Sequence, residues 1–263
     1  MPDPLNTPPV PGDPVPVVPT PPVPTAVPPA PVPSPPVPPP PVNRYNTPRQ
    51  AVKAYARSGG QDKASLRKAL REYVKTSGGG KQVLARRMYA SVQAVDRLNN
   101  VLGNFAQNGV QPTLTALNLT SYAGGAALDV LSALIDAVAP ATGQLDDALA
   151  RQAYPLMVER IDANPNLNLN SLSQTDVHEI LAVYIEETIV CRVINDIGAT
   201  LTTEQHDPAV CADMIEDLYQ IVNGAVHHDI LSGLSGTNSQ LPPDTGQRME
   251  NIYQLALDVL SNV

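Results

Sequence analysis

Thirteen lysines and arginines lie between residues 44 and 97, where only three acidic residues occur, although the 263-residue chain has a net charge of −8. Glycine clusters at 59–60 and 78–80 interrupt this basic segment. Cationic side chains and glycine N–H groups can bind phosphates or the carboxylates of another protein. The candidate residues for binding a partner or a phosphate are Arg57, Ser58, Gly59, Gly60, Arg67, Arg71, Lys75, Gly79, Gly80, Lys81, Arg86 and Arg87.

The second glycine cluster lacks the pattern of a nucleotide-binding P-loop. That loop needs Gly-Lys followed by Ser or Thr after a buried strand, whereas Gln82 follows Lys81 and no strand pattern precedes it. Backbone N–H groups near Gly80 could still bind a phosphate at the start of the next helix. The alternative is that these glycines simply separate two helices.

Three interpretations of the basic segment remain open. A nucleic-acid surface would place its cations on phosphates and stack Tyr55, Tyr73 or Tyr89 on bases. A protein-docking surface would use the same cations against an acidic partner or against the acidic half of this molecule. A solvated face with intramolecular ion pairs is the third. The concentration of charge argues against the third interpretation, and the acidic total favours protein docking.

Histidine and acidic residues offer weak alternatives. His228-Asp229 matches the two-letter signature of metal-dependent HD phosphohydrolases, with His178 and Asp258 as conceivable further ligands. That signature is too short to carry the assignment.

Zinc could in principle bind His206 with Cys191 and Cys211, but no Cys-x-x-Cys or paired-His spacing supports a site. The adjacent acids Asp146-Asp147 and Glu186-Glu187 should point about 100° apart on a helix rather than at one site. We therefore predict no catalytic residues, no metal and no cofactor, and a protein that is not an enzyme.

Composition and periodicity predict an all-α fold: a multi-helix bundle preceded by a disordered proline-rich tail. Aromatic content is only 4 %, so a core of Leu, Val, Ile and Ala is expected. We divide the chain into a tail at 1–43, a basic Gly-punctuated helical region at 44–107 and an acidic helical bundle at 108–263. The last two should form one folded unit.

The tail holds 21 of the 29 prolines within residues 1–42. Proline fixes φ and removes N–H donors, so an extended polyproline II segment is expected, acting as a tether. Its Pro-x-x-Pro matches, such as Pro21-Pro-Val-Pro24, could alternatively dock on an aromatic groove.

In the basic region, Thr47 should cap a first helix that ends near Arg57, and Asp62 should cap a second. A long third helix carries a heptad seam for packing against another helix. Its seam residues are Leu84, Met88, Ser91, Val95, Leu98, Leu102 and Phe105.

The acidic region should hold a short helical piece and five further helices. Pro155 should kink or split one of them, and Ser173 with Asp176 should open another. The expected ranges are 113–119, 126–138, 145–164, 173–197, 208–231 and a last helix around 249–260.

Two cysteines in 263 residues do not make a disulfide framework, which indicates a reducing cytoplasm. No run of 18 apolar residues occurs, so no membrane span is expected.

Several separated motifs together resemble one family, the B component of the Qat bacterial anti-phage defence system. The resemblance covers roughly residues 44–198 and is looser beyond. The motifs are Tyr55-Ala-Arg-Ser-Gly-Gly60, Ser65-Leu-Arg-Lys-Ala-Leu-Arg-Glu-Tyr73-Val, Gly79-Gly-Lys-Gln-Val-Leu-Ala-Arg86-Arg-Met88, Leu117-Asn-Leu119, Leu145-Asp-Asp-Ala-Leu-Ala-Arg151 and Asn195-Asp-Ile-Gly198.

The resemblance implies a cytoplasmic defence role beside an ATPase, a QueC-like enzyme and a TatD-like nuclease, with no enzymatic activity in this component. A QueC-like enzyme activates a carboxylate with ATP and condenses it with an amine. The N-terminus of the tail would then be a possible modification substrate. Two positions depart from the family pattern: Tyr89 stands where glycine is expected after Met88, and Pro2 follows Met1. The second departure bears on this hypothesis because Pro2, or a processed end near Gly12, would supply the amine.

Overall fold

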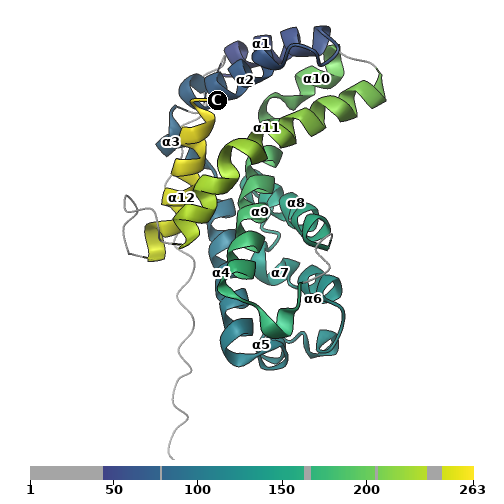
Figure 1. Cartoon of the computed structure of the whole chain (residues 1–263), viewed down its shortest axis with the longest axis vertical. Helices are drawn as coiled ribbons and strands as arrows, with labels where there is room; N and C mark the ends of the chain where they lie inside the picture. The colour runs from purple at the N-terminus through teal and green to yellow at the C-terminus, as the bar shows by residue number, and fades with distance from the viewer. Residues whose placement is uncertain (1–43, 78, 163–166, 205–206, 236–244) are drawn as a thin grey trace, which may run out of the picture. The chain divides into compact units, whose positions relative to one another are not determined.

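The computed structural model describes residues 44–263 except 78, 163–166, 205–206 and 236–244. The described residues belong to one compact unit, are predominantly helical and include no strand, which confirms the all-α fold class (Figure 1). The proline-rich tail lies outside the described residues. The helices are α1 Asn46–Arg57, α2 Lys63–Glu72, α3 Lys81–Arg87, α4 Tyr89–Asn108, α5 Val110–Ala116, α6 Ala127–Ala133, α7 Ile135–Val138, α8 Leu145–Asp162, α9 Gln174–Val193, α10 Ala199–Glu204, α11 Pro208–Ser235 and α12 Thr245–Leu260.

Four segments of 3₁₀ or π helix complete this part of the chain. Two are 3₁₀ turns, η2 Thr120–Tyr122 and η3 Leu169–Ser171. The other two, η1 Tyr73–Ser77 and η4 Ile194–Gly198, are π-helical and directly extend α2 and α9. Single π turns inside helices often occur at functional positions.

Helix ends partly follow the predicted capping. Asp62 accepts the Ser65 N–H at 3.1 Å at the start of α2. Ser173 and Asp176 form a reciprocal capping box at the start of α9. Thr47, in contrast, is inside α1, whose preceding residue is Tyr45 and makes no side-chain cap.

The structure also bears on two predictions about helix continuity. The long third helix is divided at Met88, whose φ of −100° and ψ of 22° are not helical, so α3 and α4 are separate. Of the two outcomes predicted at Pro155, a kink or a split, the split does not occur, because α8 continues through this residue as one helix. Pro155 is exposed, so the carbonyl that lacks an N–H partner can be hydrated, while buried Tyr154 and Met157 hold the flanking turns.

One hydrophobic core extends through the described chain from Ala51 to Leu260. Its centre is α9, which packs against α4, α8 and α11, and α11 in turn packs against α12 (Figure 1). The α1–α2 pair contacts this core through η1, η4 and α10. All seven predicted seam residues, Leu84, Met88, Ser91, Val95, Leu98, Leu102 and Phe105, are buried inside the protein.

Buried tyrosines supply the largest core side chains, and each of their hydroxyl groups has a partner, as buried polar groups require. The pairs are Tyr55 with Asp217, Tyr73 with Asp196, Tyr154 with the carbonyl of Leu131, Tyr184 with the carbonyl of Ala150, and Tyr253 with Thr188.

Candidate functional site

Much of the basic segment is neutralised by acids of the same molecule. Lys53 Nζ and Arg57 Nε, on α1, lie 2.5 and 2.9 Å from the Glu204 carboxylate on α10. Lys63 on α2 pairs with Asp217 on α11. The acidic half of the chain therefore supplies partners for the basic region, as both the second and the third interpretation allow.

Further cations of the segment bind η4, α12 and the C-terminal residue. Lys81 Nζ lies 3.0 Å from Asp258 on α12, and Arg71 Nη1 donates to the carbonyl of Val263 at 3.2 Å. Arg87 is 9 % exposed, and its Nη2 lies 3.9 Å from Asp196 Oδ2. These candidate residues thus have structural partners within the protein.

Four other cations are exposed and have no hydrogen bond or ion pair with another described residue. They lie on three consecutive elements: α2 packs against η1, and η1 packs against α3. We call them the cationic surface: Arg67, Lys68, Lys75 and Arg86.

The glycines of the candidate site shape helix ends. Gly59 and Gly60 follow α1 with φ of 62° and 80°, the left-handed region that glycine favours, as predicted for a helix C-terminus. Gly79 and Gly80 precede α3, which has only seven residues and whose Lys81 side chain turns to Asp258. This arrangement matches helix punctuation better than a phosphate cradle. Ser58 Oγ donates to the Tyr55 carbonyl at 2.6 Å and accepts the Asp62 N–H at 2.9 Å.

A buried polar network centres on Asp196 in the π-helical segment η4. Its Oδ2 accepts hydrogen bonds from Tyr45 and Tyr73, each at 2.7 Å, and from Arg192 Nε at 3.2 Å. Arg192 also pairs with Asp146 at the start of α8. Burial alone would raise the pKa of Asp196, but the Arg192 charge and the two phenol hydrogen bonds outweigh it and lower that pKa.

Tyr45, the second described residue, therefore anchors the beginning of the described chain to this network. Its ring stacks on that of Tyr73 with centroids 5.8 Å apart. The guanidinium groups of Arg49 and Arg87 lie 5.4 and 5.9 Å from its centroid. Sequence reasoning missed this network because Tyr45, Tyr73 and Asp196 are far apart in the chain; only the spacing of Arg192 and Asp196 by four residues was a local signal.

A second buried network corrects the expectation for the adjacent acids Glu186 and Glu187. Both are buried, and both bind one guanidinium: Arg160 Nη2 lies 2.9 Å from Glu186 and Nη1 lies 2.6 Å from Glu187. The two nitrogens of one planar fork can reach two diverging side chains, so the helical offset does not prevent convergence. Glu186 also contacts His227 Nδ1 at 2.6 Å.

Histidines and cysteines do not gather into a metal centre in the described chain, where no group of three potential ligands occurs. His178 lies in a pocket described below, His227 binds Glu186, and His206 lies outside the described residues. Cys191 is buried and Cys211 partly exposed, and neither forms a disulfide within the described chain.

The proposed stacking residues differ in accessibility. Tyr55 and Tyr73 are buried and bonded to Asp217 and Asp196, so their rings are closed to a base. Tyr89 is 39 % exposed, three residues after Arg86. Of these three, only Tyr89 offers its ring to a ligand.

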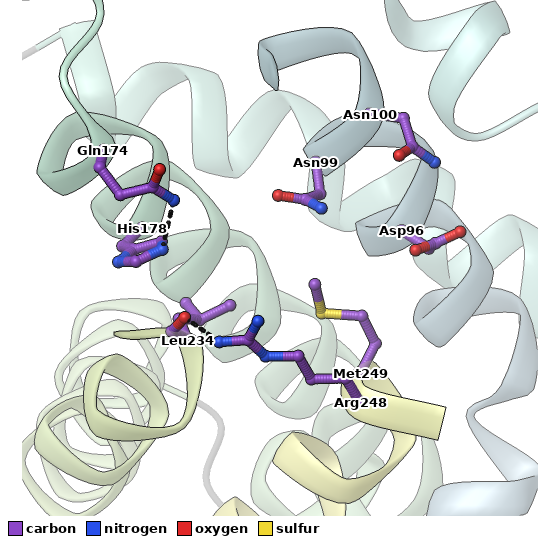
Figure 2. A pocket seen from close by; sticks show the side chains of 8 residues that line it. All are labelled: Asp96, Asn99, Asn100, Gln174, His178, Leu234, Arg248 and Met249. Atoms are coloured by element: carbon purple, nitrogen blue, oxygen red, sulfur yellow. Dashed lines mark hydrogen bonds between the residues drawn. The ribbon is translucent and has the colours of Figure 1, made fainter. Parts of the chain in front are cut away.

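A polar pocket of about 340 Å³ lies between α4, α9, α11 and α12 (Figure 2). Gln174 Nε2 lies 2.8 Å from His178 Nε2 on one wall. Burial and the charge of Arg248 lower the pKa of His178, which favours the neutral imidazole. No motif pointed to this pocket. Its lining residues are Asp96, Asn99, Asn100, Gln174, His178, Leu234, Arg248 and Met249.

Comparison with family models decides which family the chain belongs to. Residues 79–260 match the model described as Qat anti-phage system associated protein QatB. The chain belongs to this family. No curated protein and no solved structure matches it.

The matched range differs from the extent of the sequence resemblance. It begins at Gly79, after the Tyr55–Gly60 and Ser65–Val74 motifs, and continues to residue 260 beyond the expected limit at 198. Thus α3 to α12, including the polar pocket, lie in the part that the QatB family model describes. None of the described helices combines the length and apolar character that a membrane span requires.

Proposed function

We propose that this QatB-family chain is a non-catalytic adaptor that docks on another component of its anti-phage system through the cationic surface. One observation carries the proposal. Most basic residues of segment 44–97 are committed within the molecule, whereas Arg67, Lys68, Lys75 and Arg86 remain exposed and without an acidic partner in the described chain. A small unpaired cationic area suits an acidic protein surface and sets partner choice by charge complementarity.

The partner that we favour is the QueC-like component, with the ATPase and the TatD-like nuclease as further contacts, in the cytoplasm. In this proposal the tail presents its N-terminus to the QueC-like enzyme. The enzyme would activate a carboxylate with ATP, and the terminal amine would displace the activating group to form an amide. The anchoring of Tyr45 on Asp196 supports such a role, because it fixes the point from which the tail starts.

Co-purification followed by intact mass measurement tests this proposal. The tagged chain should be purified from cells in a stable complex with the QueC-like neighbour. Its intact mass should be changed, and the added mass should map to the tail. A chain that never changes mass in the presence of the partner refutes the modification, and a chain recovered without any component of the system refutes the adaptor role.

The alternative is a nucleic-acid sensor that recruits the nuclease. The exposed ring of Tyr89, three residues after the exposed Arg86 in sequence, favours it, since proteins bind single strands with cations on the phosphates and aromatic rings stacked on the bases. Binding of this kind would weaken steeply as salt increases. With four exposed cations free in the described part of the basic segment, we expect a shallower salt dependence than thirteen free cations would produce.

A further inference from the structure

The polar pocket in Figure 2 has one wall whose side chains lack partners. Asp96, Asn99 and Asn100 have the i, i+3, i+4 spacing that places side chains on one face of α4. None of their three side chains forms a hydrogen bond or ion pair with another described residue, although all three residues line the pocket. Their donors and acceptors are therefore available to a molecule inside it.

The facing wall is organised by contacts of its own. Arg248, on α12, donates from Nη2 to the carbonyl oxygens of Gly233, at 3.1 Å, and Leu234. Its Nη1 and Nε have no partner in the described chain. His178 is held by Gln174 and lies 3.4 Å from Ser235 Oγ. This wall presents a fixed cation beside an imidazole.

Opposite charges thus face one cavity without forming an ion pair. Asp96 comes from α4 and Arg248 from α12, and neither has an oppositely charged partner among the described residues. A ligand that carried only a negative charge would be repelled by Asp96, and one that carried only a positive charge would be repelled by Arg248. A molecule with both charges, separated by a few bonds, satisfies both walls.

We propose that this pocket binds a small zwitterion of the amino-acid type. Its ammonium group pairs with Asp96 and its carboxylate with Arg248. The amides of Asn99 and Asn100 bind polar atoms of the ligand, while Leu234 and Met249 contact its carbon atoms. The cavity volume of about 340 Å³ is within the range of small-molecule sites.

Nothing in the proposed adaptor role requires this ligand, so the two proposals fail independently. The cationic surface lies on α2, η1 and α3, whereas the pocket is made by α4, α9, α11 and α12. All residues that line the pocket lie inside the matched range, so the proposed amino-acid site lies in the part of the chain that the family model describes.

A thermal-shift screen of the full chain against each of the twenty common L-amino acids, at about 10 mM, tests the proposal first. At least one amino acid should raise the melting temperature. Its affinity is then compared by calorimetry with its N-acetyl derivative, which lacks the ammonium charge, and its amide, which lacks the carboxylate. Both derivatives should bind at least about tenfold more weakly.

Asp96→Asn is the matched variant, because it keeps the shape and removes the charge of a side chain that has no structural partner. It should lose at least about tenfold in affinity without loss of stability. Asp129→Asn, on the exposed part of α6, is the control and should bind normally. The proposal is overturned if no amino acid shifts the melting temperature, if the blocked derivatives bind equally well, or if Asp96→Asn binds like the wild type.

Discussion

The hydroxyl of Tyr73 donates to Asp196 Oδ2 at 2.7 Å, and this contact joins two π-helical segments, η1 and η4, across 123 residues of sequence. Tyr45 donates to the same oxygen, and Arg192 holds it from the preceding turn of the helix. The basic region, the start of the fold and the central helix α9 therefore meet at one buried carboxylate.

Replacing Asp196 with Asn should destabilise the protein by about 3 kcal/mol, because Arg192 and two phenols lose a charged partner in a buried site. Urea unfolding at neutral pH measures this change. Asp129→Asn, an exposed acid, should change stability by less than about 0.5 kcal/mol. Equal stability of the two variants would show that the network contributes nothing.

The same substitution should alter stability in acid. The pKa of Asp196 is lowered from its usual 3.8, so its ionised form stabilises the fold at neutral pH. That contribution is present above pH 3.8 and is lost as pH falls through the lower folded-state pKa. Asp196→Asn should therefore lose less stability than the wild type below about pH 4. If the free energy of unfolding of the wild type and of Asp196→Asn changed equally with pH, the stabilising role of ionised Asp196 would be contradicted.

Arg160→Ala should destabilise the protein by about 3 kcal/mol, at the lower end for a buried pair because the Arg160 side chain is 34 % exposed. Burial raises the pKa of Glu187 even with Arg160 present, so this carboxylate takes up a proton more readily in the folded state than in the unfolded chain. Stability linked to this group therefore rises as pH falls from neutrality towards 4.5. The defect of Arg160→Ala should shrink over that range, and a defect independent of pH would refute the mechanism.

The two cysteines should differ in reactivity. Burial raises the pKa of the Cys191 thiol to about 12, whereas Cys211 is partly exposed. A thiol reagent at about pH 8 should modify only Cys211 in the folded protein and both residues in denaturant. Mass spectrometry of digested protein identifies the site. Equal labelling of Cys191 before unfolding would contradict its burial.

Glycine substitutions separate backbone strain from helix propensity. Gly60 has a φ of 80°, so Gly60→Ala should destabilise by about 1 kcal/mol. Gly224 is exposed inside α11, and an added Cβ would meet nothing within 4 Å, so Gly224→Ala should stabilise by about 0.5–1 kcal/mol. Chemical denaturation of both variants checks the opposite signs. Two changes of the same sign would refute the argument.

Periodicity and capping residues predicted the helical fold, because those signals are local. The seam from Leu84 to Phe105 is buried as expected, and Asp62 and Ser173 cap their helices. The break at Met88 and the continuity through Pro155 depend on tertiary packing, which a single helix pattern does not encode.

The sites were harder to predict for the same reason. Charge counting located the basic segment, but it did not reveal that Glu204, Asp217 and Asp258 would bind its cations. Likewise, Asp96 and Arg248 belong to helices distant in sequence, so their shared pocket appears only in the folded chain. Pairings between distant elements require the structure.

Binding of the purified system components to charge-reversed variants tests the adaptor role most directly. Arg67→Glu, Lys68→Glu and Arg86→Glu are combined in one chain, with Lys53→Gln and Arg57→Gln as a control because those cations already bind Glu204. We predict that the triple variant folds normally but loses its complex with the QueC-like component, while the control variant retains it. A triple variant that still forms the complex would contradict the adaptor role. A wild-type chain that binds none of the components and retains nucleic acid until high salt would also contradict it.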